Sequence, residues 1–180
     1  MNLKARILDG DGIDKALNKI AREIVKDNAG ELSSLALVGV RTRGVPLAKR
    51  IAAYIKKAAA IDAPIGVLDI TLYRDDLGII GEHPVINSTE IEFNVIGRTV
   101  VIVDDVLFTG RTVKAAIDAV MEYGRPKKIG LAVLIDRGRR ELPIKADYIG
   151  KRVATEGNER VVVRLKETDG GDCDCAEVYC

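Results

Sequence analysis

Long hydrophobic runs are missing from this sequence. No apolar stretch approaches the roughly 20 residues that a helix needs to cross a bilayer. The N-terminus also lacks the apolar centre of a signal peptide, because Lys4, Arg6 and Asp9 interrupt it. The composition, with 47% hydrophobic and 31% charged residues, is that of an ordinary globular protein. We therefore expect a cytoplasmic protein that does not enter a membrane.

The sequence also has little net charge, few cysteines and a single histidine. The formal net charge is +1, which argues against a uniformly basic nucleic-acid binder but can conceal a basic face balanced by acidic residues elsewhere. The three cysteines, Cys173, Cys175 and Cys180, all lie near the C-terminus. Their number and spacing are a weak match to a zinc site, so we interpret them as reduced cysteines of a terminal tail at about 168–180. The single histidine, His83, is interpreted as a solvated loop residue.

Familiar phosphate and calcium motifs are also absent. Neither G-x-x-x-x-G-K-[ST] nor G-x-G-x-x-G occurs, so the P-loop and Rossmann fingerprints are excluded. The sequence Asp9-Gly10-Asp11-Gly12 begins like a calcium loop, but Ile20 stands where the bidentate glutamate is required. Capping of a helix by Asp11 is the better interpretation.

What is present is an alternation of predicted helices and buried strands. At 180 residues the chain suits a single α/β domain that spans residues 1–180. The alternation predicts a central parallel sheet flanked by helices. The apolar spacing predicts helices at about 12–28, 45–60 and 112–123, strands at 35–40, 66–73, 99–103 and 129–135, and a half-exposed edge strand at 160–166.

The segment Val103–Thr112 carries the clearest chemical signal. It runs from a buried strand through Asp104 and Asp105 into a Thr-Gly-Arg-Thr turn and a helix. Amides at a helix N-terminus can bind a phosphate, and adjacent carboxylates at a strand end can accept hydrogen bonds from two ribose hydroxyls. Gly110 permits the ligand to approach the backbone closely. The plain alternative is a capped turn with two exposed acids, but the whole order of residues favours a sugar-phosphate site.

A second loop after a buried strand is Arg41-Thr42-Arg43-Gly44. Two guanidinium groups around a tight turn can bind a pyrophosphate through charge-assisted hydrogen bonds. Solvated basic residues are an equally good interpretation of this loop alone.

These residues carry a resemblance to the type I phosphoribosyltransferases, whose motif for phosphoribosyl pyrophosphate (PRPP) is similar to Val103–Thr112. The likeness extends to Val-Gly-Val-Arg-Thr-Arg-Gly, Asp-Ile-Thr-Leu-Tyr-Arg-Asp-Asp-Leu and Arg-Glu-Leu-Pro-Ile-Lys-Ala-Asp-Tyr-Ile-Gly-Lys. Within that family the chain resembles the bifunctional members that join uracil phosphoribosyltransferase activity to attenuation of pyrimidine operons. The resemblance implies the type I phosphoribosyltransferase fold with a lid or hood segment, formation of UMP and pyrophosphate from uracil and PRPP with Mg²⁺, and binding of a pyrimidine-operon mRNA hairpin.

The resemblance also implies roles for individual residues. Asp104, Asp105 and Arg74 are expected to be catalytic, and no protein ligand to the metal is assigned. Arg74 lies at the base of a predicted lid at about 72–95, a segment without sustained periodicity that could also be a structural hairpin. PRPP and nucleotide are expected to contact Arg41, Thr42, Arg43, Gly44, Asp104, Asp105, Val106, Leu107, Phe108, Thr109, Gly110, Arg111 and Thr112.

Contacts to the base and to RNA are expected from other parts of the chain. Asp136, Arg137, Tyr148 and Ile149 resemble positions near the base, although Tyr148 could equally be a core residue. The basic residues predicted to contact RNA, which could instead form a solvated helix face, are Lys15, Lys19 and Arg22 on the first helix together with Arg139 and Arg140. A homodimer or larger assembly is implied. Two alternatives remain open: a nucleotide-sensing RNA-binding regulator with little catalysis, and a transferase for a purine base.

Overall fold

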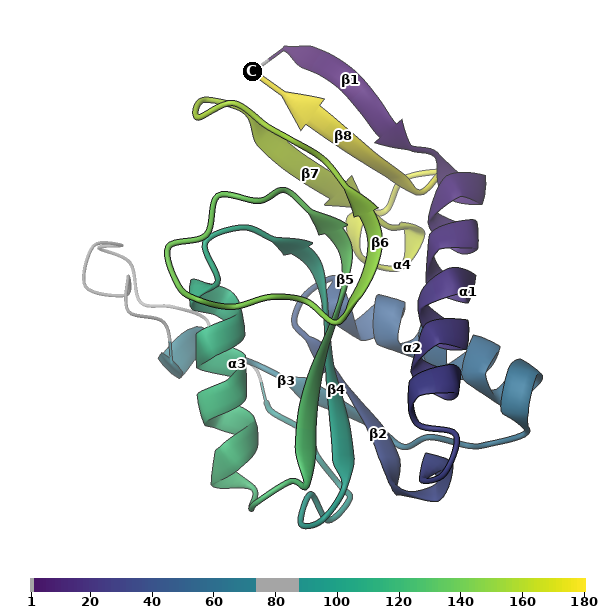
Figure 1. The fold of residues 1–180 in the computed structure, drawn as a ribbon. Helices are drawn as coiled ribbons and strands as arrows, with labels where there is room; N and C mark the ends of the chain where they lie inside the picture. The colour runs from purple at the N-terminus through teal and green to yellow at the C-terminus, as the bar shows by residue number, and fades with distance from the viewer. Residues whose placement is uncertain (1, 74–87) are drawn as a thin grey trace.

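A computed structural model of the chain describes residues 2–73 and 88–180. Within these residues a parallel sheet of five strands has the order β3-β2-β4-β5-β6, as Figure 1 shows. The strands are β2 (Leu35–Val40), β3 (Ile65–Leu68), β4 (Thr99–Leu107), β5 (Lys128–Asp136) and β6 (Tyr148–Arg152). The predicted α/β fold class with a central parallel sheet is confirmed.

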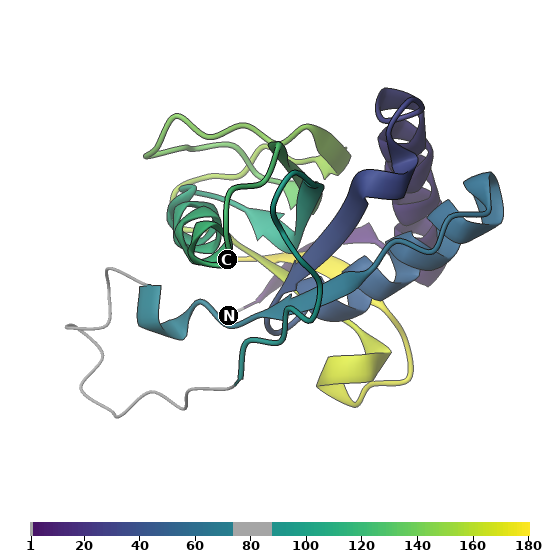
Figure 2. The ribbon, with the colours of Figure 1, turned by 90° about the horizontal axis from the view of Figure 1, so that it is seen from below.

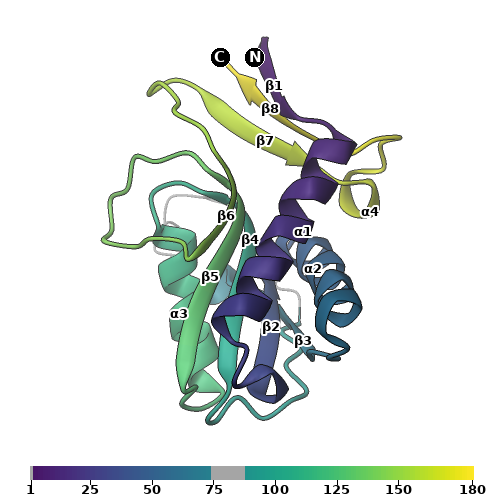
Figure 3. The same ribbon diagram turned by 45° about the vertical axis from the view of Figure 1, so that its right-hand side comes forward.

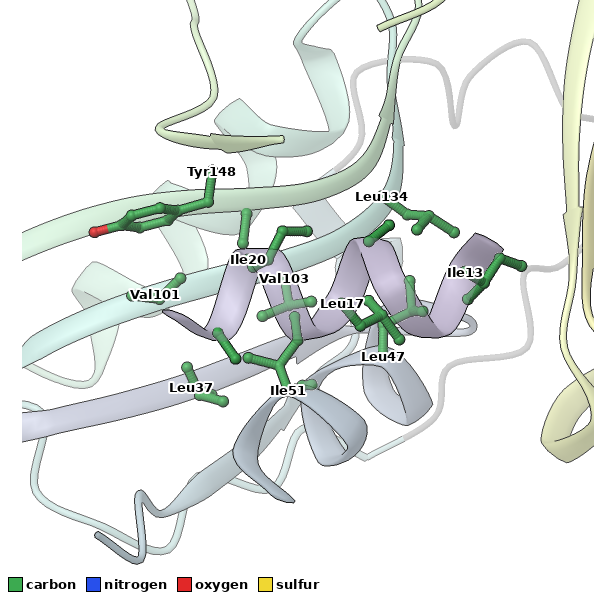
Figure 4. Packing of buried hydrophobic residues seen from close by; sticks show 14 of the residues in the cluster. Ile13, Leu17, Ile20, Leu37, Leu47, Ile51, Val101, Val103, Leu134 and Tyr148 are labelled. Atoms are coloured by element: carbon green, nitrogen blue, oxygen red, sulfur yellow. The ribbon is translucent and has the colours of Figure 1, made fainter. Parts of the chain in front are cut away.

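Helices cover both faces of this sheet. The helices α1 (Gly10–Asp27) and α2 (Gly44–Ala59) lie on one face, and α3 (Arg111–Glu122) lies on the other (Figures 1 and 2). Ile13, Leu17 and Ile20 of α1 pack against α2 and the central strands, as Figure 4 shows. Because side chains alternate along a strand, Val101 and Val103 of β4 belong to this core, whereas Val100 and Ile102 face α3. A strand buried on both faces explains why β4 is apolar at every position from Val100 to Val103.

A second sheet lies beyond the carboxyl ends of the parallel strands (Figure 1). It is antiparallel and has the order β1-β8-β7, so the first and last strands of the chain pair with each other. Figure 3 shows the two termini side by side. The strands are β1 (Leu3–Leu8), β7 (Arg160–Arg164) and β8 (Cys175–Tyr179), and the short helix α4 (Lys166–Asp169) follows β7.

Several predicted elements differ from the structure. Residues 168–180 were expected to form a tail but contain β8, whose buried Glu177 is stabilised by Arg6 of β1 and Arg164 of β7. The strand expected at 66–73 ends at Leu68, and Thr71–Tyr73 forms a 3-10 turn, η2. The cap of α1 is Asp9 rather than Asp11, because a carboxylate oxygen of Asp9 accepts a hydrogen bond from the Gly12 amide at 2.8 Å.

Over residues 2–73 and 88–180, no helix combines the length and the apolar character that crossing a bilayer requires.

Candidate active site

The acid pair lies on β4 itself, which continues past the predicted end at Val103 to Leu107. An oxygen of the Asp104 carboxylate accepts a hydrogen bond from the Asp105 amide at 2.9 Å. Asp105 in turn accepts one from the Val106 amide at 2.8 Å. Asp104 is buried and Asp105 is partly buried. The two carboxylates are therefore held in fixed orientations at the carboxyl end of the sheet.

Burial of the two carboxyl groups disfavours their ionised forms. Burial raises the pKa of Asp104 well above 3.8, and the adjacent Asp105 raises it further. Burial also raises the pKa of Asp105, while the nearby Arg43 guanidinium opposes this rise. A hydroxyl or a cation bound at the pair would stabilise the ionised forms, since hydrogen bonds and positive charge both favour a carboxylate. The pair is thus suited to hold a diol or a magnesium-bound ligand.

The loop Arg41–Gly44 packs directly on β4. A side-chain carbon at Gly44 would lie 2.3 Å from the Val103 carbonyl oxygen, so only glycine permits this contact. The peptide bond between Arg41 and Thr42 is cis. Arg43 forms an ion pair with Asp169 of α4, and Arg41 donates to the Ser88 carbonyl oxygen at 3.1 Å. Arg41 also forms an ion pair with Glu90, so both guanidinium groups are held by residues from other parts of the chain.

A pocket of about 350 Å³ lies between the loop Arg41–Gly44 and the acid pair. Sequence reasoning missed part of its wall, Asp69–Thr71, which follows the end of β3. The Asp69 carboxylate accepts hydrogen bonds from the amide and the hydroxyl of Thr71 and so turns the chain toward the pocket. The position of this segment directly after a strand was the available signal, because ligands bind at the carboxyl ends of parallel strands. The pocket is lined by Arg41, Thr42, Arg43, Asp69, Ile70, Thr71, Asp104, Asp105, Val106 and Thr112.

The turn into α3 is the predicted phosphate loop. Gly110 has a φ of 95°, a left-handed conformation that glycine adopts readily. The Thr109 carbonyl oxygen accepts hydrogen bonds from the amides of Glu141 and Leu142 at 3.0 and 3.1 Å, which fixes the turn from outside. The Arg111 amide, the first of α3, donates to the Thr109 hydroxyl at 3.4 Å. The first amides of a helix have no partner within the helix, and this arrangement is suited to binding an anion.

The residues predicted to contact the base divide into two groups. Asp136 forms an ion pair with Arg140, and the guanidinium of Arg137 lies 3.8 Å from the centre of the Phe108 ring. This places Arg137 against the phosphate loop, and burial lowers its pKa. Both residues also line a second pocket, of about 380 Å³, at the ends of β5 and β6.

Tyr148 and Ile149 are core residues. Tyr148 is only 3% exposed and lies in the core near α1 (Figure 4). Its hydroxyl accepts a hydrogen bond at 3.4 Å from the side-chain nitrogen of Asn28, the residue at the C-terminal cap of α1. Ile149 is 6% exposed and packs on the face of the sheet that α3 covers. Pairing through β5 places Ile149 level with Asp104, so burial of the two side chains, and not their height along the sheet, separates them from the acid pair. A contact of Tyr148 or Ile149 with the base stays a prediction that the position of neither side chain supports.

The basic residues predicted to contact RNA differ in their availability. Arg22 and Arg139 are exposed. Lys19 donates to the Ile149 carbonyl oxygen at 2.9 Å and lies 3.7 Å from Glu23. Arg140 donates to Asp136 and to the Phe108 carbonyl oxygen, so it also stabilises the phosphate loop. Arg74, His83 and the central part of the predicted lid lie outside the described residues.

The family of the chain follows from these features and from comparison with known proteins. The model of the phosphoribosyl transferase domain matches residues 5–166, a range that includes the acid pair, the phosphate loop and the loop at Arg41–Gly44. The chain therefore belongs to the phosphoribosyltransferase family.

Its similar relatives give a more particular assignment. Proteins named Bifunctional protein PyrR are 58% identical in Roseiflexus sp. over 92% of this chain and 90% of theirs, and 59% identical in Pelotomaculum thermopropionicum over 93% and 92%. A third, from Thermus aquaticus, is 53% identical over 96% and 94%. Within the family, this chain groups with the PyrR proteins.

Solved structures of greater sequence distance share the fold. A hypoxanthine-guanine phosphoribosyltransferase from Bacillus anthracis has a TM-score of 0.73 at 18% identity, covering 99% of this chain and 100% of its own. The Trypanosoma cruzi hypoxanthine phosphoribosyltransferase with its product IMP has a TM-score of 0.69 at 16% identity, covering 89% and 80%. At such identities the likeness concerns the fold alone.

Proposed function

We propose that this chain transfers the 5-phosphoribosyl group of PRPP to uracil, giving UMP and pyrophosphate. The observation that carries the proposal is the meeting of the acid pair, the arginine loop and the start of α3 at one pocket. The choice of uracil rests on the resemblance of the motifs to uracil phosphoribosyltransferases and on the group of relatives that the chain matches. The purine transferases with a similar fold are too distant in sequence to argue for a purine base.

Each element has a task in this reaction. The amides and hydroxyls from Thr109 to Thr112 bind the 5-phosphate, and Asp104 and Asp105 accept hydrogen bonds from the ribose hydroxyls. Arg41 and Arg43 bind the pyrophosphate. The bond between ribose C1 and a pyrophosphate oxygen breaks with its electron pair on the pyrophosphate, and C1 forms a bond to uracil N1, whose proton passes to water. The two carboxylates lie where they stabilise the positive charge that develops on the ribose, and no protein nucleophile is required.

Magnesium suits the donors of this pocket. The acidic side chains that line it offer only oxygen, which Mg²⁺ prefers, and it binds proteins through one or two carboxylates with further oxygens from substrate phosphates. Residues 2–73 and 88–180 contain no cluster of three or more histidine, cysteine, aspartate or glutamate side chains that would form a cage of protein ligands. Asp104 and Asp105 would hold the ion together with PRPP, and its charge would favour departure of the pyrophosphate.

The test is UMP formation from uracil, PRPP and Mg²⁺ by the wild-type chain and by the variant with Asp104→Asn and Asp105→Asn. We expect turnover by the wild type and its loss in the variant, with PRPP binding measured in parallel. Hypoxanthine, guanine and adenine serve as competing bases, and a preference for any of them would contradict the assignment of uracil. A folded wild type that binds PRPP or UMP without turnover would favour a nucleotide-sensing regulator.

We further propose that the chain binds pyrimidine-operon mRNA in a UMP-dependent way, as a homodimer or larger assembly. The similar relatives are named bifunctional, and Arg22 and Arg139 are exposed basic residues that could contact RNA phosphates. Affinity for a hairpin RNA should fall steeply with salt, because binding releases counterions. It should also respond to UMP, and an affinity independent of UMP would contradict the regulatory role. Sedimentation of the free protein tests the assembly.

A further inference from the structure

The second sheet reaches into the site through one ion pair. The Arg43 guanidinium donates from Nε to Oδ2 of Asp169 at 3.0 Å and from Nη2 to Oδ1 of the same carboxylate. Arg43 caps α2 at the site, whereas Asp169 ends α4, which follows β7 of the second sheet. Residues far apart in the sequence thus form a two-pronged contact at the wall of the active-site pocket.

The Asp169 carboxylate is itself fixed by its neighbours. Oδ2 accepts hydrogen bonds from the Leu165 amide at 2.9 Å and from the Thr168 hydroxyl at 2.8 Å. A second ion pair joins α4 to α2, since Arg50 donates to both oxygens of Glu167 at 2.9 and 2.7 Å. The Asp169 carboxylate is therefore held in one position by hydrogen bonds of its own.

The geometry of the pair leaves Arg43 able to bind a ligand. Only the edge formed by Nε and Nη2 faces Asp169, so Nη1 and the second proton of Nη2 remain for another acceptor. Arg43 also lines the pocket with Asp104 and Asp105 and interacts electrostatically with Asp105. A free arginine side chain samples many rotamers, and a bidentate partner removes that freedom before the ligand arrives.

We propose that Asp169 is a positioning residue of the active site, which holds the Arg43 guanidinium where the pyrophosphate group of PRPP binds. The inference rests on the proposed transferase function and adds to it a contribution from the second sheet. Asp169 acts through Arg43 and does not touch the substrate.

The test compares Asp169→Asn with the wild type in steady-state kinetics and in calorimetric titration with magnesium pyrophosphate. We expect the KM for PRPP and the Kd of pyrophosphate to rise about tenfold, the effect of losing roughly 1.4 kcal/mol of binding energy, with the KM for uracil unchanged. Glu167→Gln is the matched control, because it removes the other ion pair between α4 and α2 and leaves the contact of Asp169 with Arg43 in place. It should leave the KM for PRPP and the Kd of pyrophosphate unchanged.

A double-mutant cycle separates positioning from a general structural role. In the Arg43→Ala background, Asp169→Asn should have no further effect on pyrophosphate binding, because its only route to the ligand is gone. The same weakening in both backgrounds would overturn the inference, and so would tighter pyrophosphate binding by Asp169→Asn alone. A wild type that binds pyrophosphate but forms no UMP would refute the transferase, whereas the binding arms would still decide the role of Asp169.

Discussion

Substitution of Gly44 by alanine tests whether the arginine loop must pack on the backbone of β4. The new methyl carbon would lie 2.3 Å from the Val103 carbonyl oxygen, and an ordinary contact begins at 3.4 Å, so the loop or the strand must move by about 1 Å. The neighbour is backbone of a buried strand and cannot rotate away. Overpacking of this kind costs about 1–3 kcal/mol of unfolding free energy, or a fall in Tm of about 2–12 °C for a domain of this size.

The effect on activity should be larger than the effect on stability. A displacement of about 1 Å moves Arg41 and Arg43 away from the acid pair, and misplacement of this size costs on the order of 100-fold in rate. The assays are thermal unfolding and kcat/KM for PRPP. Gly30→Ala is the control, since a methyl group there meets nothing within 4 Å. A Gly44→Ala variant with the Tm and kcat/KM of the wild type would refute the argument.

Three further substitutions test the electrostatics and the core. Asp104→Asn should abolish UMP formation yet raise Tm at neutral pH, because burial raises the pKa of Asp104, and this gain should shrink as the pH falls toward 3.8. Glu177→Gln should lower the unfolding free energy by about 1–3 kcal/mol in urea titrations. The Tyr179 hydroxyl, Arg6 and Arg164 lower the pKa of Glu177, so the loss should disappear as the pH falls below 4.5 and the wild-type carboxylate takes up a proton. Tyr148→Phe should leave the KM for uracil unchanged and cost about 1 kcal/mol of stability, since a single buried hydrogen bond is lost.

Each of these expectations has a contrary outcome. An unchanged or lower Tm for Asp104→Asn at neutral pH would mean that the buried charge does not oppose folding. A loss in Glu177→Gln that persists at low pH would assign it to packing. A raised KM for uracil in Tyr148→Phe would place that ring back at the base.

The parallel sheet was predictable because its signals are local. Leu35–Val40 is a run of apolar and small residues, and the structure gives a strand with the same bounds. Of the second sheet only β7 was predicted, as the edge strand at 160–166. The strands β1 and β8 were not predicted, since they carry Arg6 and Glu177 and meet only through pairing across nearly the whole chain. The burial of Glu177 between two arginines belongs to the folded sheet and leaves no local pattern in the sequence.

The part of the site that is local in the sequence was predictable, and the part that depends on the fold was not. The acid pair and the turn from Thr109 to Thr112 form one continuous motif, so their neighbourhood followed from the order of residues. Arg43 and Asp169 are joined only by the fold. Tyr148 shows a further limit: the sequence placed it near a strand, but the face of the sheet on which its ring lies depends on register.

The pairing of β1 with β8 has a consequence for how the protein is made. The amide of Asn2 donates to the Cys180 carbonyl oxygen at 2.9 Å, and β8 stands between β1 and β7. Because β8 is synthesised after β1 and β7 and is the middle strand of their sheet, β1 has no partner strand until β8 has been made, whereas α1 and the parallel strands can fold earlier. A chain that lacked β8 would expose the unpaired edges of β1 and β7, and unpaired strand edges are the surfaces through which chains aggregate.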